Sequence, residues 1–213
     1  MEFNRSFDSI IKSVCDIFAN AKVNMKPIYH NSPEYDLLEE YCDAHECSVR
    51  SGLTKFVFNF DHNDNFVVKI PFAGTYYWSN KGYENYGTNH CETELDVYEY
   101  LKDTEIGPLL VPTVFIGKVN GLELYAQPKV EVFNYDKHSP SKKSYNEVED
   151  FGWHDCTGDD EDVIASFIEY FGITEAERIL DCLDDEGIRD IHSGNFGYLN
   201  GALVLFDYSG YHS

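Results

Sequence analysis

The sequence has few basic residues and no long apolar run. Of its 213 residues, 16 are Lys or Arg and 38 are Asp or Glu, giving a formal net charge of −22 at pH 7. Most of such a surface would repel nucleic-acid phosphates and anionic membranes, so we expect neither as a direct partner. No apolar stretch approaches the ~20 residues of a membrane span, and the N-terminus has none of signal-peptide length. These absences favour a soluble, cytoplasmic protein. Two interpretations of the acidic surface remain. It keeps the protein soluble, or it mimics a polyanion and occupies a DNA-binding protein.

The cysteine pattern argues against a disulfide scaffold. The six cysteines are spread along the chain, and no two form a C-x-x-C pair. His45 with Cys47, and His90 beside Cys91, could begin a zinc site, but neither has the paired spacing of a structural zinc site. With 43% hydrophobic and 15% aromatic residues, the chain can build an ordinary core with reduced thiols.

Helical periodicity predicts five helices. Apolar residues recur at helical spacing over 7–18, and YDLLEEYCDAH follows a polar break with two prolines. The segments TNHCETELDVYEYLKDT, EDVIASFIEYFG and TEAERILDCLDDEG are also amphipathic. Residues 131–162 are polar, acidic and punctuated by Gly, Pro and Ser, so we expect a surface loop there with a short helix at most.

Three hairpins are predicted as well. KFVFNF and NFVVKIPF are β-rich and are joined by the turn-forming cluster DHND. VPTVFIGKV and LELYAQPKV are joined by Asn120-Gly121, a strong hairpin turn. In the tail, a short strand, the Asn200-Gly201 turn and a second strand lead to Asp207.

Three oxygen-bearing side chains are spaced so that they would converge. Asp190 and Asn195 lie five residues apart on one loop, and the following hairpin would bring Asp207 back beside them. Phosphoryl transfer needs an orienting carboxylate and oxygen ligands for Mg²⁺. The pattern is therefore compatible with that chemistry, although an acidic pair near a hairpin is more often a solvated turn.

Lys69 stands in the middle of VVKIPF, flanked by apolar residues. A lysine on a buried strand is costly without a partner, and the following helix offers Glu94 or, as a second choice, Glu92. The alternative is an edge-strand lysine that points to water. A strand lysine, a helix glutamate, D-x-x-x-x-N and an Asp at a strand end follow one another in the order found in protein kinases.

This order of motifs resembles the protein-kinase-like superfamily, which includes the aminoglycoside phosphotransferases. DIHSGN is similar to the D-x-H-x-x-N catalytic loop of those phosphotransferases. VVKIPF, DIHSGNFGYLNG and FDYSGY also resemble small kinase-like proteins of bacterial viruses and prophages. The resemblance implies an α+β, two-lobed fold. It comprises a helical extension (1–44), an N-lobe with about five antiparallel strands and one helix (45–128), and a reduced, mainly helical C-lobe (129–213).

The resemblance also implies ATP and Mg²⁺ (or Mn²⁺) as cofactors and a role for each motif residue. Asp190 would be the catalytic aspartate, with Asn195 and Asp207 holding the metal. Lys69 would contact the α- and β-phosphates, and Glu94 would hold Lys69.

Two further segments take their expected roles from the same resemblance. Ser51 to Lys55, with Gly52, stands at the position of the glycine-rich loop and would cover the phosphates. Gln127 to Val130 would form the linker that meets adenine.

The chain departs from the family pattern at several points. The phosphate loop has one glycine, Gly52, where several are usual. Ile188 replaces the histidine two residues before the catalytic aspartate, and Tyr208-Ser209 replaces Phe-Gly after the metal aspartate. The sequence ends at Ser213, so we expect no activation segment and none of the later helices that dock a peptide.

Three functions follow as expectations. The first is an ATP-dependent phosphotransferase, a kinase that modifies a host protein. The second is a kinase-fold binding module of the pseudokinase type, and the third is an acidic inhibitor. In each case the charge of −22 favours a basic host protein as acceptor or partner.

Overall fold

The computed structural model describes residues 7–29, 32–60, 65–73, 75–79, 82–86, 89–148 and 161–208. The chain divides into two compact units, Met1–Leu95 with Thr113–Lys129 and Asp96–Pro112 with Val130–Ser213. The described residues form seven α-helices and ten strands in antiparallel sheets, so the predicted α+β class is confirmed. Within these ranges, no helix is long and apolar enough to cross a membrane.

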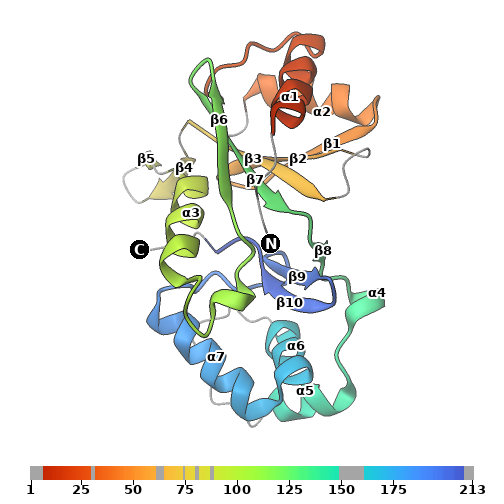
Figure 1. Cartoon of the computed structure of the whole chain (residues 1–213), viewed down its shortest axis with the longest axis vertical. Helices are drawn as coiled ribbons and strands as arrows, with labels where there is room; N and C mark the ends of the chain where they lie inside the picture. Colours follow the sequence, from red (N-terminus) through yellow and green to blue (C-terminus); the bar gives the residue numbers. More distant parts are fainter. Residues whose placement is uncertain are drawn as a thin grey trace. The chain divides into compact units, whose positions relative to one another are not determined.

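The first unit is built on a five-stranded antiparallel sheet in the order β1-β2-β3-β7-β6 (Figure 1). Its strands are β1 Cys47–Ser51, β2 Lys55–Phe60, β3 Phe66–Pro71, β6 Val114–Val119 and β7 Leu122–Pro128. Both hairpins predicted for this region are present. The second turns at Asn120 and Gly121, whose φ angles of 51° and 88° are those that an Asn-Gly turn adopts readily.

Side-chain alternation gives this sheet one apolar and one polar face. The helices α1 (Asp8–Asn20) and α2 (Pro33–Asp43) lie beside this sheet (Figure 1). The three Phe residues of β2 and the aliphatic residues opposite them on β3 share a buried core with residues of both helices. The two helices of the predicted N-terminal helical extension (1–44) therefore share a core with the sheet. Because successive side chains point to opposite faces, Lys55 and Lys69 lie on the face away from this core.

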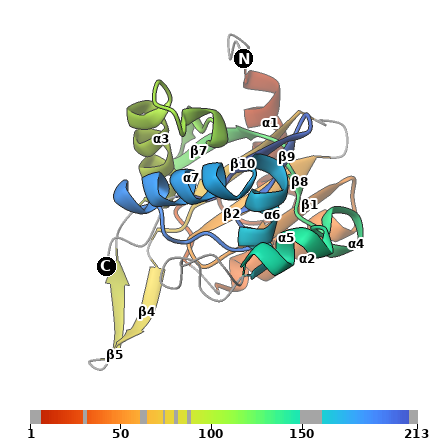
Figure 2. The same cartoon turned by 90° about the horizontal axis from the view of Figure 1, so that it is seen from below.

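Two elements follow β3 in the first unit. β4 (Thr75–Ser79) and β5 (Gly82–Tyr86) pair as an antiparallel hairpin that the sequence analysis did not predict (Figure 2). α3 spans His90–Leu101, close to its predicted bounds, and its residues after Leu95 are grouped with the second unit.

The second unit has a helical layer and a small sheet. Its helices are η1 Gly107–Leu109, α4 Tyr135–His138, α5 Lys142–Val148, α6 Glu161–Phe171 and α7 Ile173–Asp185. Its strands, β8 Glu131–Val132, β9 Phe196–Leu199 and β10 Ala202–Leu205, pair in the order β10-β9-β8. α5 packs beside α6, and α6 beside α7 (Figure 2). The shared core includes Leu101, Phe133, Phe167, Leu180 and Phe196.

The segment expected to be a surface loop is more ordered than predicted. Its described part contains β8, α4 and α5 rather than one short helix at most. Polar contacts fix it, since the Ser141 and Ser144 hydroxyls both donate to the carboxylate of Glu169 on α6. These two hydrogen bonds, of which the one from Ser141 has the larger effect, hold the pKa of the Glu169 carboxyl below its usual value. Hydrophobic periodicity does not register such contacts, which explains the error.

Candidate functional site

A buried ion pair joins β3 to α3 in the first unit. The Lys69 ammonium donates to Glu94 Oε2 at 2.8 Å, and the two side chains are 3% and 0% exposed. The expected contact between Lys69 and Glu94 is therefore present, and Glu92 lies exposed on the same helix. A buried charge needs such a partner, because leaving water costs several kcal/mol per ion.

Lys55 makes a second buried contact with the same carboxylate. Its ammonium donates to Glu94 Oε1, whereas Lys69 uses Oε2, and Lys55 is also only 3% exposed. The sequence had assigned Lys55 to a loop over the phosphates. The structure instead makes it the first residue of β2, buried in the sheet. No sequence motif predicted that one glutamate would bind two lysines.

Two neutral residues extend the network around Glu94. The Thr113 hydroxyl donates to Glu94 Oε2 at 3.2 Å, and Gln127 Nε2 donates to Thr113 Oγ1 at 3.1 Å. Gln127, predicted in a linker, lies inside β7 and is 1% exposed, while Val130 follows the strand in the second unit. The amide side chain of Gln127 is thus engaged by the ion-pair network. No motif in the sequence had singled out Thr113 as a functional residue.

Asn89 fixes the start of α3 and thereby the position of Glu94. Its Oδ1 accepts from the backbone N–H groups of Cys91 and Glu92, both at 3.1 Å, as an N-cap residue does. Its Nδ2 donates to Glu123 at 2.7 Å and to the Tyr125 hydroxyl at 3.0 Å, both on β7. Burial raises the pKa of Tyr125, so this hydroxyl stays neutral and tethers the helix to the sheet.

In the second unit, Asp190 and Asn195 are joined by the loop that carries them. Asn195 is buried, and its Nδ2 donates to the Asp190 carbonyl at 2.7 Å. His192 Nδ1 accepts from the Gly194 N–H at 3.0 Å, which leaves the ring proton on Nε2, 3.7 Å from Asp190 Oδ1. The Asp190 carboxylate is about half-exposed, so it can meet a reactant from solution.

The final hairpin brings the residue preceding Asp207 beside Asn195. Phe196 pairs with Leu205, and the Phe206 N–H donates to the Asn195 carbonyl at 3.0 Å. Tyr208, on the far side of Asp207, is 1% exposed and its hydroxyl donates to the Val111 carbonyl at 2.6 Å. Hydrogen bonds on either side thus fix the chain around Asp207. The predicted hairpin is present, and the convergence of the Asp190, Asn195 and Asp207 side chains stays a prediction.

Asn195 and Asp207 are the residues that could hold a metal ion, if other ligands came from outside the chain. In the part of the chain that the structure describes, no three His, Cys, Asp or Glu side chains gather as a metal site. Asn195 and Asp207 offer one amide and one carboxylate oxygen, and such sets bind Mg²⁺ when phosphates and water supply the remaining ligands.

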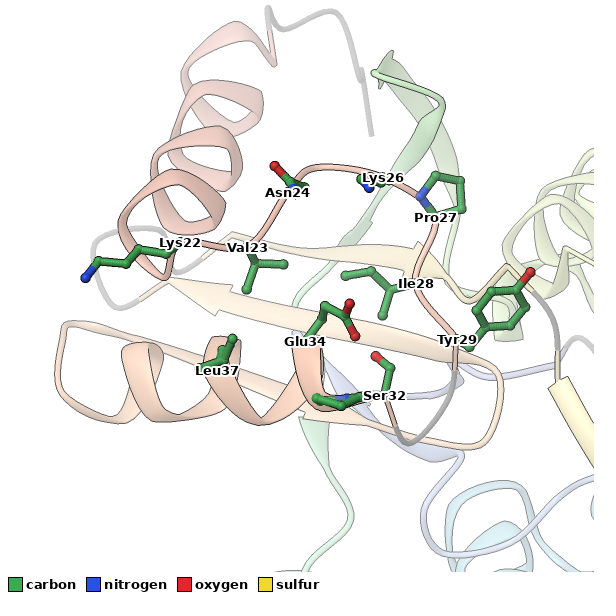
Figure 3. Close-up of a pocket in the computed structure, with 11 residues that line it drawn as sticks. Lys22, Val23, Asn24, Lys26, Pro27, Ile28, Tyr29, Ser32, Glu34 and Leu37 are labelled. Atoms are coloured by element: carbon green, nitrogen blue, oxygen red, sulfur yellow. The ribbon is translucent and has the colours of Figure 1, made fainter.

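A separate hollow of about 440 Å³ lies within the first unit. It is bounded by the segment from Lys22 to Tyr29 and by the start of α2 (Figure 3). Val23 and Ile28 point towards α2, whereas Lys22 points away from it (Figure 3). The hollow is lined by none of the residues predicted for the phosphate site.

Comparisons with models of protein families, with curated protein sequences and with solved structures find no match to this chain. A functional assignment therefore rests on the residues and geometry described above.

Proposed function

We propose that this protein is an ATP- and Mg²⁺-dependent phosphotransferase with a reduced protein-kinase-like fold. The observation that carries the proposal is the buried pair of Lys69 on β3 and Glu94 on α3. Replacing a whole buried ion pair by well-packed apolar residues is often neutral or stabilising, so stability alone does not account for a buried lysine and glutamate. A lysine held in place by a helix glutamate is instead a means of presenting a fixed positive charge to a phosphate.

Under this proposal, three residues of the second unit would take the other roles in phosphoryl transfer. Asp190 would orient the acceptor hydroxyl and receive its proton as the hydroxyl oxygen bonds to the γ-phosphorus. The bond from that phosphorus to the β–γ bridging oxygen breaks, and ADP leaves. Asn195 and Asp207 would hold Mg²⁺ or Mn²⁺, which neutralises phosphate charge when bound.

The test is transfer of label from γ-labelled ATP, to the chain itself and to basic acceptor proteins. We expect Asp190→Asn to lower the rate by at least about a hundredfold, in line with the contribution of a positioned acid or base. Asp185→Asn is the matched control, because Asp185 is an exposed carboxylate at the end of α7. Lys69→Met should lower transfer far more than it lowers stability.

Equal activity in Asp190→Asn and Asp185→Asn would exclude Asp190 from the reaction. Nucleotide binding without any transfer would favour the alternative, a kinase-fold binding module. Asp207→Ala should abolish Mg²⁺-dependent nucleotide binding while the fold survives. If that variant bound Mg-ATP as the parent does, Asp207 would not be a ligand.

The acceptor or partner is proposed to be a basic host protein. The net charge of −22 accelerates encounter with a basic surface, and salt screens that attraction over about 8 Å at physiological ionic strength. We expect poor activity on generic peptides and partner binding that weakens as salt rises. Strong phosphorylation of acidic peptides, or partner binding that is indifferent to salt, would contradict this part of the proposal.

A further inference from the structure

The loop between β1 and β2 does not offer its glycine to a phosphate. In glycine-rich phosphate loops, backbone N–H groups point at the ligand. Here the N–H of Gly52 donates to the carbonyl of Lys55 at 3.2 Å, so it is used inside the turn. The Thr54 carbonyl accepts from the Phe72 N–H at 3.0 Å, which ties the same turn to the end of β3.

A charged side chain stands immediately after this closed turn. Lys55 is the first residue of β2 and pairs with Pro71, while Val57 pairs with Lys69. Because the side-chain period of a strand is two, Lys55, Val57 and Lys69 share one face of the sheet. The two lysines are thus diagonal neighbours across an antiparallel pair.

The shared carboxylate brings the two ammonium groups still closer. Lys55 binds Glu94 Oε1 and Lys69 binds Glu94 Oε2, so the two cations are separated by one carboxylate group. A phosphate chain that reaches Lys69 therefore also comes within reach of Lys55.

We propose that Lys55 is a second phosphate-binding cation and that it replaces the glycine-rich backbone cradle. This inference rests on the proposed function, since it concerns the phosphate chain of the same nucleotide. Lys55 and Lys69 divide the negative charge of that chain, and Glu94 holds both lysines in position. The ligand class is a polyphosphate, either in a nucleoside di- or triphosphate or as inorganic tripolyphosphate.

Calorimetric titration of wild type, Lys55→Met and Lys118→Met with Mg-ATP, Mg-ADP, AMP, adenosine and tripolyphosphate tests the inference. Lys118 is the matched control, because it also lies on the sheet and binds a glutamate, Glu123, at 2.9 Å, but is 55% exposed. We expect Lys55→Met to weaken the binding of ATP and of tripolyphosphate about tenfold or more, which is the effect of losing a hydrogen bond to a charged group. The affinity for AMP should fall less, and the affinity for adenosine should not change. The Lys118→Met variant should bind every ligand as wild type does.

A role for Lys55 in structure alone predicts a different pattern, in which Lys55→Met weakens every ligand equally, adenosine included. That result, or unchanged binding of ATP and tripolyphosphate, would overturn the inference. If Lys55→Met does not fold, Lys55→Gln, which removes the charge and keeps a polar N–H group on a slightly shorter side chain, carries the same expectation.

Failure of the inference and failure of the proposed function are distinguishable. If wild type binds ATP but transfers no label, the transferase is refuted, and the comparison of Lys55 variants still decides the role of Lys55. If wild type transfers label and the Lys55 variant binds ATP as tightly, only the inference fails. Wild type that binds neither ATP nor tripolyphosphate overturns both.

Discussion

The sharing of Glu94 between two lysines predicts strong energetic coupling between them. Glu94 is fully buried, and its partners are Lys55, Lys69 and the Thr113 hydroxyl. After Lys69→Met or Lys55→Met alone, the carboxylate keeps one cation. After both substitutions it keeps only the neutral threonine, and an uncompensated charge is left in the interior.

The magnitudes follow from this difference. Each single substitution removes one charged hydrogen bond and adds apolar packing, so we expect a loss of about 1 kcal/mol in the free energy of unfolding. Removing the last partner of a buried charge costs a further ~3–5 kcal/mol, so the double variant should lose about 5 kcal/mol in total. The interaction energy between the sites is then about 3 kcal/mol, well outside the additivity found for independent sites.

The assay must report on the first unit, because the chain has two units and need not unfold as one. Native-state hydrogen exchange of amides in β2, β3 and α3, measured against urea, provides this readout. The triple variant Lys55→Met, Lys69→Met, Glu94→Gln should recover most of the stability, because it removes the orphan charge.

The exposed pair on the same sheet is the control. Lys118→Met and Glu123→Gln remove a Lys–Glu contact whose side chains are 55% and 30% exposed. An exposed pair contributes about 0–1 kcal/mol, so little change is expected. If the double Lys55 and Lys69 variant were simply additive, or the triple variant were no more stable than the double, the reasoning about Glu94 would be refuted.

Three further perturbations test the second unit. Asn195→Ala removes the bond to the Asp190 carbonyl and should cost about 1–2 kcal/mol; unchanged hydrogen exchange in β9 and β10 would contradict the described role of Asn195. Tyr208→Phe removes the 2.6 Å hydrogen bond to the Val111 carbonyl and should cost a similar ~1–2 kcal/mol, measured by urea denaturation. Glu169→Gln tests the lowered pKa of Glu169. A carboxyl whose pKa is lowered in the folded state stabilises that state at pH values above its unfolded pKa of ~4.3. This contribution disappears as the pH falls through the pKa of the folded state. The variant should therefore be less stable than wild type at pH 7 and equal to it near pH 2. A stability difference that persists unchanged at pH 2 would show that charge is not the cause.

The sequence by itself determined most of the local structure. Hydrophobic periods of about 3.6 and 2 residues distinguish helices from strands, and Asn120-Gly121 and Asn200-Gly201 specify tight turns wherever they occur. These signals depend on neighbours along the chain, which is why five helices and three hairpins could be predicted from them. The pairing of Lys69 with Glu94 was also predicted, because a lysine amid apolar strand residues is costly without a partner and the following helix offers acids.

Only the tertiary structure decided which groups share a partner. The position of Lys55 on the face of Lys69 depends on the register of β2 against β3, and the position of Thr113 depends on how the chain returns after α3. The order of the segment after residue 131 likewise depends on Glu169, more than twenty residues away from Ser141 and Ser144. Contacts between residues distant in sequence carry no periodicity, since they arise from packing of whole elements. A single sequence therefore names the charged residues of this site, while the fold determines which of them meet.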